Sequence, residues 1–460
     1  MAKISEDGMM VGKKAVFTVV IVSLLSARAQ ADKYSGGTGE PNNPYRIQTP
    51  NDLNDIGNHP EDFNDCFILV NDINMADFTY TTALIAPDIS SSVGFQGTAF
   101  TGIFDGNDRI ISNLTIDTAG ADNSCLGLFG RIVGTAEIKN LGIEDVNITG
   151  GVFSEWVGGL VGDNSGTILN CYATGVVSES SEVGGLVGYN SGSISNCFAT
   201  GSVSGDDDVG GLVGYNWYGN ISQCHTTESV CGVSTVGGLV GYNFGSISNC
   251  CATGTVEGDD SVGGLVGYNS AAISNCCATG SVSGDDDVGG LVGCTWYGSI
   301  SNSYATGSVT GDGYVGGLVG YQYSGSYTSC FWDQTVNPSL QGIGNAGDPD
   351  VSGKTTAQMQ IETTFTDAGW DFVGEIVNGP NDVWTIHETV DYPKHVWPLV
   401  NFVGWYEVDF LDYAYFANHW QDINCGVSND CDGADLDFSD AVDWVDLKIF
   451  CDHWLEGTSY

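Results

Sequence analysis

One hexapeptide, Val-Gly-Gly-Leu-Val-Gly, recurs along the middle of this chain at nearly constant spacing. Its seven copies begin at Val157, Val183, Val209, Val236, Val262, Val288 and Val315. Successive copies are therefore 26 or 27 residues apart. A second phrase, such as ISNCFATGSVSG at 194–205, runs between them. Each unit is rich in β-branched residues and punctuated by Gly, Asn and Asp, which is typical of short strands and turns. A fixed period of this kind predicts stacked repeats.

A unit of this length with roughly three short strands fits one coil of a parallel β-helix, because each coil buries the faces that its neighbours expose. Asn113-Leu-Thr-Ile116 and Asn140-Leu-Gly-Ile143 lie 27 residues apart, so the period begins before the first hexapeptide. The sequence predicts an all-β solenoid of about ten coils at 64–335. An N-terminal cap at 32–63 and a C-terminal cap at 336–404 would cover its ends.

The paired phrases resemble the GLUG repeat of secreted bacterial surface and adhesin-like proteins, most clearly at 157–320. The resemblance implies a right-handed β-helix, an extracellular location, and an adhesive or glycan-related role. The repeat itself brings no known catalytic residues. Function therefore has to be sought in departures from the repeat.

Residues 1–31 have the features of a secretory signal peptide. Lys13 and Lys14 precede an apolar run at 15–25, and Ala-x-Ala cleavage patterns follow at 27–31. Met9 or Met10 would give a more ordinary start than Met1. No later segment is long and apolar enough to span a bilayer. We therefore expect a secreted or cell-surface protein without membrane insertion of the mature chain.

The formal net charge is −45, and no Lys or Arg occurs between Lys139 and Lys354. Such a surface repels phosphate backbones, which excludes nucleic acid as a partner. It also lacks the cations that lyases use on uronate carboxylates. With 42% hydrophobic and 11% aromatic residues, the chain has the composition of a folded protein.

Many of the 15 cysteines follow the repeat. One position of the unit is occupied by Cys171, Cys197, Cys224, Cys250 and Cys276, then by Ser303 and Cys330. Equivalent residues in coils about 4.8 Å apart lie within disulfide range. The column can therefore be a buried ladder of thiols, which so regular a pattern favours, or a set of bridges between coils. Cys425 and Cys431, close together in a Gly/Asn loop, are the better candidates for a disulfide.

Two units carry an extra residue in one turn, at Trp217-Tyr218-Gly219 and at Trp296-Tyr297-Gly298. Insertions in solenoids tend to mark the functional face. The two tryptophans are three coils, or roughly 14 Å, apart along the axis. Trp217, Tyr218, Trp296 and Tyr297 are therefore candidate residues for stacking on the sugar rings of a polysaccharide. The alternative is that these rings only pack over a neighbouring coil.

Residues 405–460 contain an internal duplication with an offset of 34, in which 408–420 matches 442–454. Apolar residues follow the helical period in both copies, which predicts two helices. Ahead of the second helix, oxygen-bearing side chains stand at loop positions 1, 3, 5, 9 and 12. This spacing is that of an EF-hand calcium loop.

The paired loop-helix arrangement resembles a dockerin, a small module that binds a cohesin on a partner protein. The resemblance implies one Ca²⁺ site and a cohesin-like partner. Its ligands would be Asp435, Asp437, Ser439, the Ala441 carbonyl, Asp443 and Asp446. Asp440 stands where the usual turn glycine belongs, and the first loop keeps only Asp409 and Asp412, so we expect weak binding. An acidic helix pair without metal is the alternative.

No constellation for catalysis is evident: the six histidines form no close metal pair, and no nucleophile-elbow or phosphate-loop motif occurs. The sequence favours a non-enzymatic adhesin or polysaccharide-binding protein that docks through its calcium module. Two alternatives stay open. One is a polysaccharide-degrading hydrolase or lyase that uses two carboxylates, and the other is a structural spacer of the cell envelope.

Overall fold

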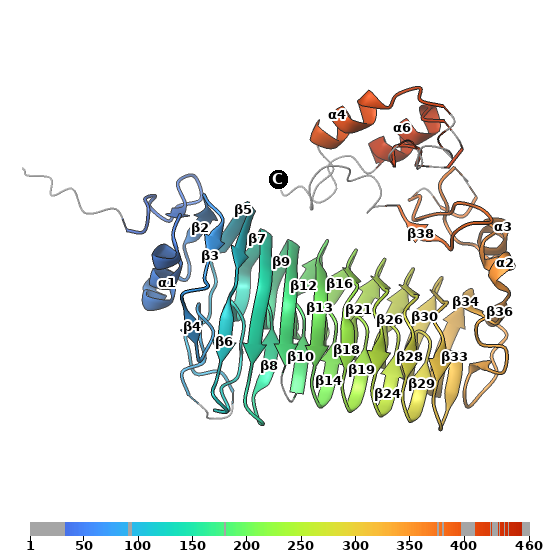
Figure 1. The fold of residues 1–460 in the computed structure, drawn as a ribbon, viewed down its shortest axis with the longest axis horizontal. Coiled ribbons are helices and arrows are strands. Elements are labelled where there is room, and N and C mark those ends of the chain that lie inside the picture. The colour runs from blue at the N-terminus through green and yellow to red at the C-terminus, as the bar shows by residue number, and fades with distance from the viewer. Residues whose placement is uncertain are drawn as a thin grey trace, which may run out of the picture.

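The computed structural model describes residues 33–90, 94–178, 181–374, 377–379, 381–396, 410–423, 425, 431, 433–436, 438–439 and 441–452. The predicted signal peptide and parts of the predicted dockerin-like module lie outside the described residues. Most described strands join one sheet whose pairings are parallel. The chain thus forms a parallel β-solenoid of about eight regular coils with few helices (Figure 1). Its right-handed winding stays a prediction.

Each regular coil contains four strand positions, a to d, which pair with the same positions of the next coil. In residues 181–204 these are β10 Ser181–Gly184, β11 Val187–Asn190, β12 Ser193–Ser195 and β13 Phe198–Ser204. Val183 pairs with Val209, Tyr189 with Tyr215 and Ile194 with Ile221. The sequence period is thus the register of the sheet.

The other coils repeat this order. Position a is formed by β8 Glu155–Gly158, β14 Asp207–Gly210, β19 Ser234–Gly237, β24 Asp260–Gly263 and β29 Asp286–Gly289. Position b is formed by β15 Val213–Asn216, β20 Val240–Asn243 and β25 Val266–Asn269. Position c is formed by β16 Asn220–Ser222, β21 Ser246–Ser248 and β26 Ala272–Ser274.

Position d is split into two short strands in several coils. They are β17 His225–Thr226, β18 Ser229–Cys231, β22 Cys251–Ala252, β23 Val256–Glu257, β27 Cys277–Ala278, β28 Val282–Ser283, β31 Tyr304–Ala305 and β32 Val309–Thr310. Longer strands span several positions near the ends of the stack. They are β7 Phe129–Thr149, β9 Val161–Ser178, β30 Val292–Ser301 and β33 Val315–Thr328, followed by β34 Cys330–Asp333.

The N-terminal part enters the same ladders less regularly. Its strands are β1 Tyr45–Ile47, β2 Cys66–Leu69, β3 Ile73–Asn74, β4 Thr79–Tyr80, β5 Ile103–Ser112 and β6 Thr115–Asp117. Because long irregular connections join them, the regular coils begin near Leu126, which bridges to Val157. This explains why about eight regular coils form instead of the ten predicted. Helix α1, Pro50–Asn58, and the 3₁₀ turn Pro60–Asp62 lie at this end (Figure 1).

The interior repeats the same contacts in every coil. In 181–204, Val183, Leu186, Val187, Ile194 and Cys197 are fully buried. Strand b ends in a buried asparagine ladder in which each amide donates to the next, with N···O distances of 2.7–2.8 Å. Its members are Asn164, Asn190, Asn216, Asn243 and Asn269. These bonds satisfy polar groups that would otherwise be costly to bury.

The cysteine column is a buried ladder of free thiols, as the regular pattern predicted. Its members are Cys171, Cys197, Cys224, Cys250, Cys276 and Cys330, and a buried Ser303 fills the place in the coil before Cys330. Each thiol donates within its own coil, as Cys197 Sγ does to Ser195 O at 3.1 Å. A bridge between coils forms one residue later, between Cys251 and Cys277. The predicted Cys425–Cys431 disulfide is also present.

One interior position departs from the repeat. The register of β13 with β17 and β18 places Glu228 opposite Gly201, and the next coil has Gly254 there. The Glu228 side chain runs inward to Gly185 of the preceding coil, where both of its carboxyl oxygens crowd the position that a Cβ would take. Glu228 is 3% exposed, and its Oε2 has no hydrogen-bond partner among the described residues. Burial raises the pKa of this carboxyl well above its usual range.

The last coil is followed by β35 Gln341–Ile343 and β36 Val351–Lys354, which continue its ladders. The chain then folds back over the flank of the solenoid through α2 Thr356–Met359, α3 Thr363–Thr366, β37 Trp384–Thr385 and β38 Lys394–His395. Tyr304 Oη donates to Pro393 O at 2.6 Å, and His395 Nε2 lies 2.8 Å from Asn275 O. Trp370 and Trp384 are fully buried in this contact.

Two further helices, α4 Phe410–Asn418 and α6 Trp444–Asp452, contact each other through Phe416 and Phe450, whose ring centres lie 5.2 Å apart. Lys448 Nζ of α6 pairs with Asp382 Oδ2 at 2.7 Å, which ties the helices to the folded-back segment. Among the described residues, none of the helices has the length and hydropathy needed to cross a bilayer.

Candidate functional site

The corner between strand positions b and c, called here the b–c corner, differs in its residues from coil to coil. Its first residue follows the asparagine ladder or that ladder's continuation. In successive coils this residue is Ser165, Ser191, Trp217, Phe244, Ser270, Trp296 and Tyr323. The ladder amide also accepts a hydrogen bond from the backbone two residues later, as Asn243 Oδ1 does from Gly245 N at 3.1 Å. This turn leaves the intervening side chain, here Phe244, on the outer surface.

The first aromatic cluster consists of Trp217, Tyr218 and Phe244. The Trp217 ring centre lies 4.7 Å from that of Tyr218 and 5.1 Å from that of Phe244. Trp217 is nevertheless 38% exposed and Tyr218 is 70% exposed. Trp217 therefore both packs over the neighbouring coil and faces solvent.

The second aromatic cluster consists of Trp296, Tyr297 and Tyr323. The Trp296 and Tyr323 rings stack with their centres 3.9 Å apart and their planes 14° from parallel. Tyr297 stands edge-on to Tyr323 at 5.6 Å. The three side chains are 39%, 64% and 53% exposed. A contiguous exposed aromatic surface of this kind is typical of a face that binds a ligand, not of a face that contacts only water.

The structure therefore brings all four predicted aromatic residues to one corner, in two clusters. The extra residue of each longer unit is absorbed by a left-handed backbone, with φ +59° at Tyr218 and +64° at Tyr297. Sequence analysis missed Phe244, because its coil has no inserted residue, and Tyr323, because its coil is followed by no further hexapeptide that would reveal the inserted residue in Tyr323-Ser324-Gly325. Their signal was an aromatic ring at the corner position where other coils have serine.

A ladder of tyrosines lies beside the corner at the end of strand b. The ring centres of Tyr189, Tyr215, Tyr242 and Tyr268 are 5.6, 5.0 and 4.4 Å apart in successive coils, with nearly parallel planes. Tyr242 also stacks on Phe244 at 5.1 Å. The ladder thus supports the first cluster from one side.

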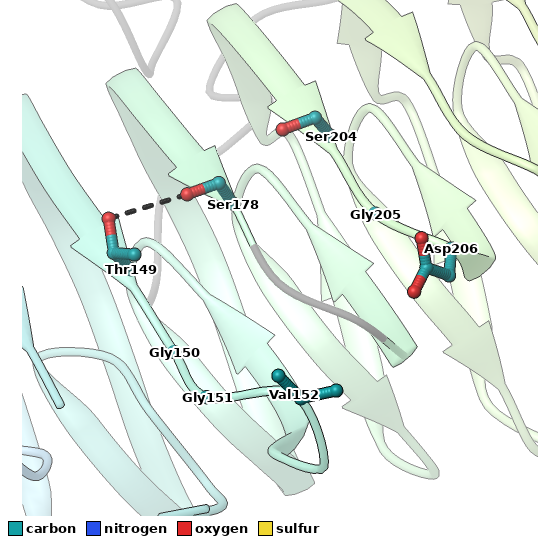
Figure 2. A pocket seen from close by; sticks show the side chains of 8 residues that line it. All are labelled: Thr149, Gly150, Gly151, Val152, Ser178, Ser204, Gly205 and Asp206. Carbon is teal, nitrogen blue, oxygen red and sulfur yellow. Dashed lines mark hydrogen bonds between the residues drawn. The ribbon is translucent and has the colours of Figure 1, made fainter. Parts of the chain in front are cut away.

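A separate groove of about 400 Å³ lies at another corner of the solenoid, where strand d leads into the next coil. Figure 2 shows its lining, which consists of Thr149, Gly150, Gly151, Val152, Ser178, Ser204, Gly205 and Asp206. Thr149 Oγ1 and Ser178 Oγ lie 3.4 Å apart. Hydroxyl groups, glycine backbone and one carboxylate suit a polar ligand, but the wall offers no aromatic face. Sequence analysis did not identify this groove.

Two half-buried carboxyl groups occupy equivalent positions of neighbouring coils. Ser181 pairs with Asp207 and Val183 with Val209, so Glu182 lies opposite Asp208. Burial raises the pKa of Glu182 to about 8, and the charges of Glu155 and Asp208 add to the effect. Burial also raises the pKa of Asp208 to about 6, against a hydrogen bond from Thr235 that lowers it. At neutral pH the first is mainly protonated and the second mainly ionised.

The predicted calcium loop is described in part, because Asp437 lies outside the described residues. Asp446 accepts hydrogen bonds from Leu436 N at 2.6 Å and Asp443 N at 2.8 Å, which closes the loop. Asp435 Oδ1 accepts from Ser439 N at 3.0 Å, and Ser439 Oγ donates to the Ala441 carbonyl at 3.2 Å. Asp435 and Asp446 are both buried.

These oxygen donors fit the chemistry of Ca²⁺. Among the described residues, however, no cluster of three or more His, Cys, Asp or Glu side chains is arranged to hold a metal. Asp443 instead uses Oδ1 to accept from Val445 N at the start of α6. The described part of the loop therefore contributes two buried carboxylates to the predicted ligand set.

Comparison with known proteins identifies the repeat. Residues 179–204, 207–230, 232–257, 258–283 and 286–310 match the model of the GLUG motif. A stretch of 151 residues is 34% identical to halomucin of Haloquadratum walsbyi. Another, of 156 residues, is 35% identical to a protein of Evansella cellulosilytica provisionally named a Gly-rich membrane protein.

These matches cover 31% and 33% of this chain but only 2% and 17% of the two relatives. Among solved structures, a Bacteroides ovatus protein provisionally described as an immunoglobulin A1 protease has a TM-score of 0.40 and 20% identity. That alignment covers 79% of this chain and 95% of the other. The matched segments identify the chain as a solenoid that contains GLUG repeats.

Proposed function

We propose that this GLUG-repeat solenoid binds polysaccharide through the two aromatic clusters of its b–c corner. The observation that carries the proposal is that both clusters lie on the same corner and stay exposed, although neighbouring coils have serine there. Aromatic rings offer large rigid surfaces at low cost in conformational entropy, which suits stacking on sugar rings. The solenoid backbone fixes the position of each ring.

The proposed location is the outside of the cell or its surface. The apparent signal peptide at 1–31 supports this, and so do the names of the relatives, halomucin and a Gly-rich membrane protein. The absence of cations between Lys139 and Lys354 is consistent with a role away from nucleic acids.

The binding test uses residues 32–460 and a panel of insoluble and soluble polysaccharides. Retention and newly formed chain ends are recorded together. We expect retention without new ends, and loss of at least tenfold in affinity for Trp217→Ala and Trp296→Ala. Phe153→Ala is the control, because Phe153 is also an exposed aromatic residue, at 75%, but lies at a different corner. Unchanged retention in both tryptophan variants would refute the assignment.

The C-terminal helices are proposed to form a calcium-dependent docking module for a cohesin-like partner. Asp435, Asp437, Ser439, the Ala441 carbonyl, Asp443 and Asp446 would hold the ion. Burying two carboxylates in one loop is costly, and a bound cation offsets that cost. Chelation of Ca²⁺ should lower the melting temperature of the C-terminal module in the whole protein and leave that of the solenoid unchanged. Asp446→Asn should abolish this response. A melt that is the same with and without chelator would refute the site.

Hydrolysis of a polysaccharide is a second candidate, favoured by Glu182 and Asp208. The backbones of equivalent residues in adjacent coils lie about 4.8 Å apart, and retaining glycosidases hold their two carboxyl groups about 5–5.5 Å apart. A protonated acid beside an ionised carboxylate is the pairing that such enzymes use. New chain ends that vanish in both Glu182→Gln and Asp208→Asn would establish this function. If neither activity nor binding is found, a structural spacer of the cell envelope is the role that is left.

A further inference from the structure

The b–c corner differs in charge from the rest of the solenoid. From Ser191 to Ser326 its residues are Ser, Gly, Trp, Tyr, Asn, Phe, Ala and Gln, and none of them is charged. The acidic residues of the repeats gather instead at the turn into strand a and in its first residues, as at 206–208, 259–260, 285–287 and 312. The aromatic clusters are thus an uncharged stripe on a protein of net charge −45.

The two clusters lie one behind the other along the solenoid axis. The first occupies the fourth and fifth coils and the second occupies the seventh and eighth, as the pairing of their strands shows. The sixth coil separates them with Ser270, whose Oγ donates to the Trp296 carbonyl at 2.6 Å. Trp217 and Trp296 are three coils, or roughly 14 Å, apart along the axis. A ligand that contacts both clusters must therefore be long and must lie parallel to the axis.

We propose that the corner is a two-point platform for one extended, uncharged polysaccharide chain that lies along the solenoid axis. This inference rests on the proposed polysaccharide binding and adds the class of the ligand and its direction. An acidic polysaccharide is disfavoured, because no cation between Lys139 and Lys354 offsets the repulsion of the acidic turns. A chain bound at one cluster presents its next rings to the other at high effective concentration, which raises affinity without new contacts.

The test measures affinity by titration with a length series of oligosaccharides prepared from whichever neutral polysaccharide is retained. Wild type, Trp217→Ala, Trp296→Ala and the double variant are compared, with Phe153→Ala as the control. Short oligomers, which reach one cluster, should bind weakly to wild type and to each single variant. Oligomers that span both clusters should bind wild type at least tenfold more tightly, and either single variant should lose this gain.

A gain-of-function variant strengthens the test. Ser270→Trp places a ring between the two clusters and should lower the shortest oligomer length at which affinity rises. Ser191→Trp, at the equivalent position outside the clusters, is the matched control and should leave that length unchanged. Thermal melting of each variant confirms that these surface changes leave the fold intact.

Several results would overturn the inference while leaving polysaccharide binding in place. One is a single variant that loses only about twofold in affinity for long oligomers, as expected for two independent sites. Another is tighter binding of polygalacturonate or alginate than of neutral chains, weakening as salt rises. Absence of binding to every polysaccharide would instead remove the proposed function itself.

Discussion

The interior of the solenoid repeats its residues from coil to coil, whereas the residues of its b–c corner vary. Inside, the same side chain recurs coil after coil, because each residue contacts its own equivalent at a fixed spacing, as the asparagine ladder does. At the corner, serine, tryptophan, phenylalanine and tyrosine replace one another without disturbing the register. A parallel stack thus separates residues that maintain the fold from residues that are free to acquire a function.

Glu228 is an exception to this separation between repeated interior residues and variable corner residues. It is an interior residue that does not match its equivalents, Gly201 and Gly254, and it buries a carboxyl without a described partner. The stack accommodates it, yet such a group costs stability. The predictions below compare interior and corner positions, in order of decreasing effect.

The largest effect is expected at the first glycine of the hexapeptide. A Cβ on Gly263 would overlap Val266 O and lie 2.6 Å from Gly293 N, and neither backbone atom can move without shifting a coil. Gly263→Ala should therefore lower the free energy of unfolding by about 3–4 kcal/mol, measured by denaturant titration. Gly347→Ala is the control, because no atom lies within 4 Å of its Cβ position. Equal stability of the two variants would contradict the close contact.

Removal of the buried carboxyl should stabilise the protein. Glu228→Gly restores the repeat residue and should raise the free energy of unfolding at neutral pH by roughly 2–3 kcal/mol. The folded state raises the pKa of Glu228, so it retains the proton that the unfolded chain loses near pH 4.3. The loss of stability that comes from keeping Glu228 protonated in the folded state is therefore absent below about pH 4.3. It grows as pH rises toward the pKa of Glu228 in the folded state.

Glu228→Gln separates charge from size in the same experiment. The amide is as large as the carboxyl but does not ionise, so the stability difference between this variant and wild type should grow with pH. Urea titrations at pH 4 and pH 8 measure that difference. A pH-independent difference would show that ionisation of Glu228 does not oppose folding.

The asparagine ladder should give a smaller effect than either change. Asn243→Ala removes the bonds to Asn216 and Asn269 and leaves amide groups unpaired in the interior. A loss of about 1–2 kcal/mol in the free energy of unfolding is expected. Asn220→Ala, at the exposed first residue of β16 in the preceding coil, is the control and should change the free energy of unfolding by less than about 0.5 kcal/mol. If Asn243→Ala proved as mild, the ladder would not stabilise the stack.

The smallest effect on stability is expected at the corner itself. Trp217→Ala and Trp296→Ala remove rings whose aromatic contacts are with other rings at the surface, not with the buried core. The free energy of unfolding should therefore fall by less than about 1 kcal/mol. The affinity for polysaccharide should nevertheless fall at least tenfold. A large fall in the melting temperature would show that the clusters stabilise the fold. The corner would then not differ from the interior in this respect.

The repeat made the fold predictable. A 26-residue spacing leaves little choice of architecture, and the register of Val183 with Val209 follows from it directly. The number of regular coils was harder to predict from the sequence, because strands such as Cys66–Leu69 enter the ladder through connections that do not follow the period. The fold-back of 356–396 onto the flank depends on non-repetitive contacts, such as that of Tyr304 with Pro393.

The candidate site was predictable only where the sequence breaks its own pattern. The inserted residues drew attention to Trp217 and Trp296. Phe244 lies in a unit without an insertion, and the insertion beside Tyr323 lies after the last hexapeptide, where the spacing no longer reveals it. The pairing of Glu182 with Asp208 follows from the repeat, but the groove at Thr149 depends on which turns lie side by side in three dimensions. Asp437 lies outside the described residues, so the complete calcium loop stays a prediction.

The thiol column has a consequence for the lifetime of the protein. While the coils are closed, the thiols of Cys171, Cys197, Cys224, Cys250 and Cys276 are fully buried. In an oxidising medium, a chain that opens exposes them together, and a disulfide between thiols of non-adjacent coils then joins coils out of register. Refolding is blocked after such an event, so unfolding becomes irreversible. In such a medium, the half-life of the protein is then governed by the rate of first opening, not by the folding equilibrium.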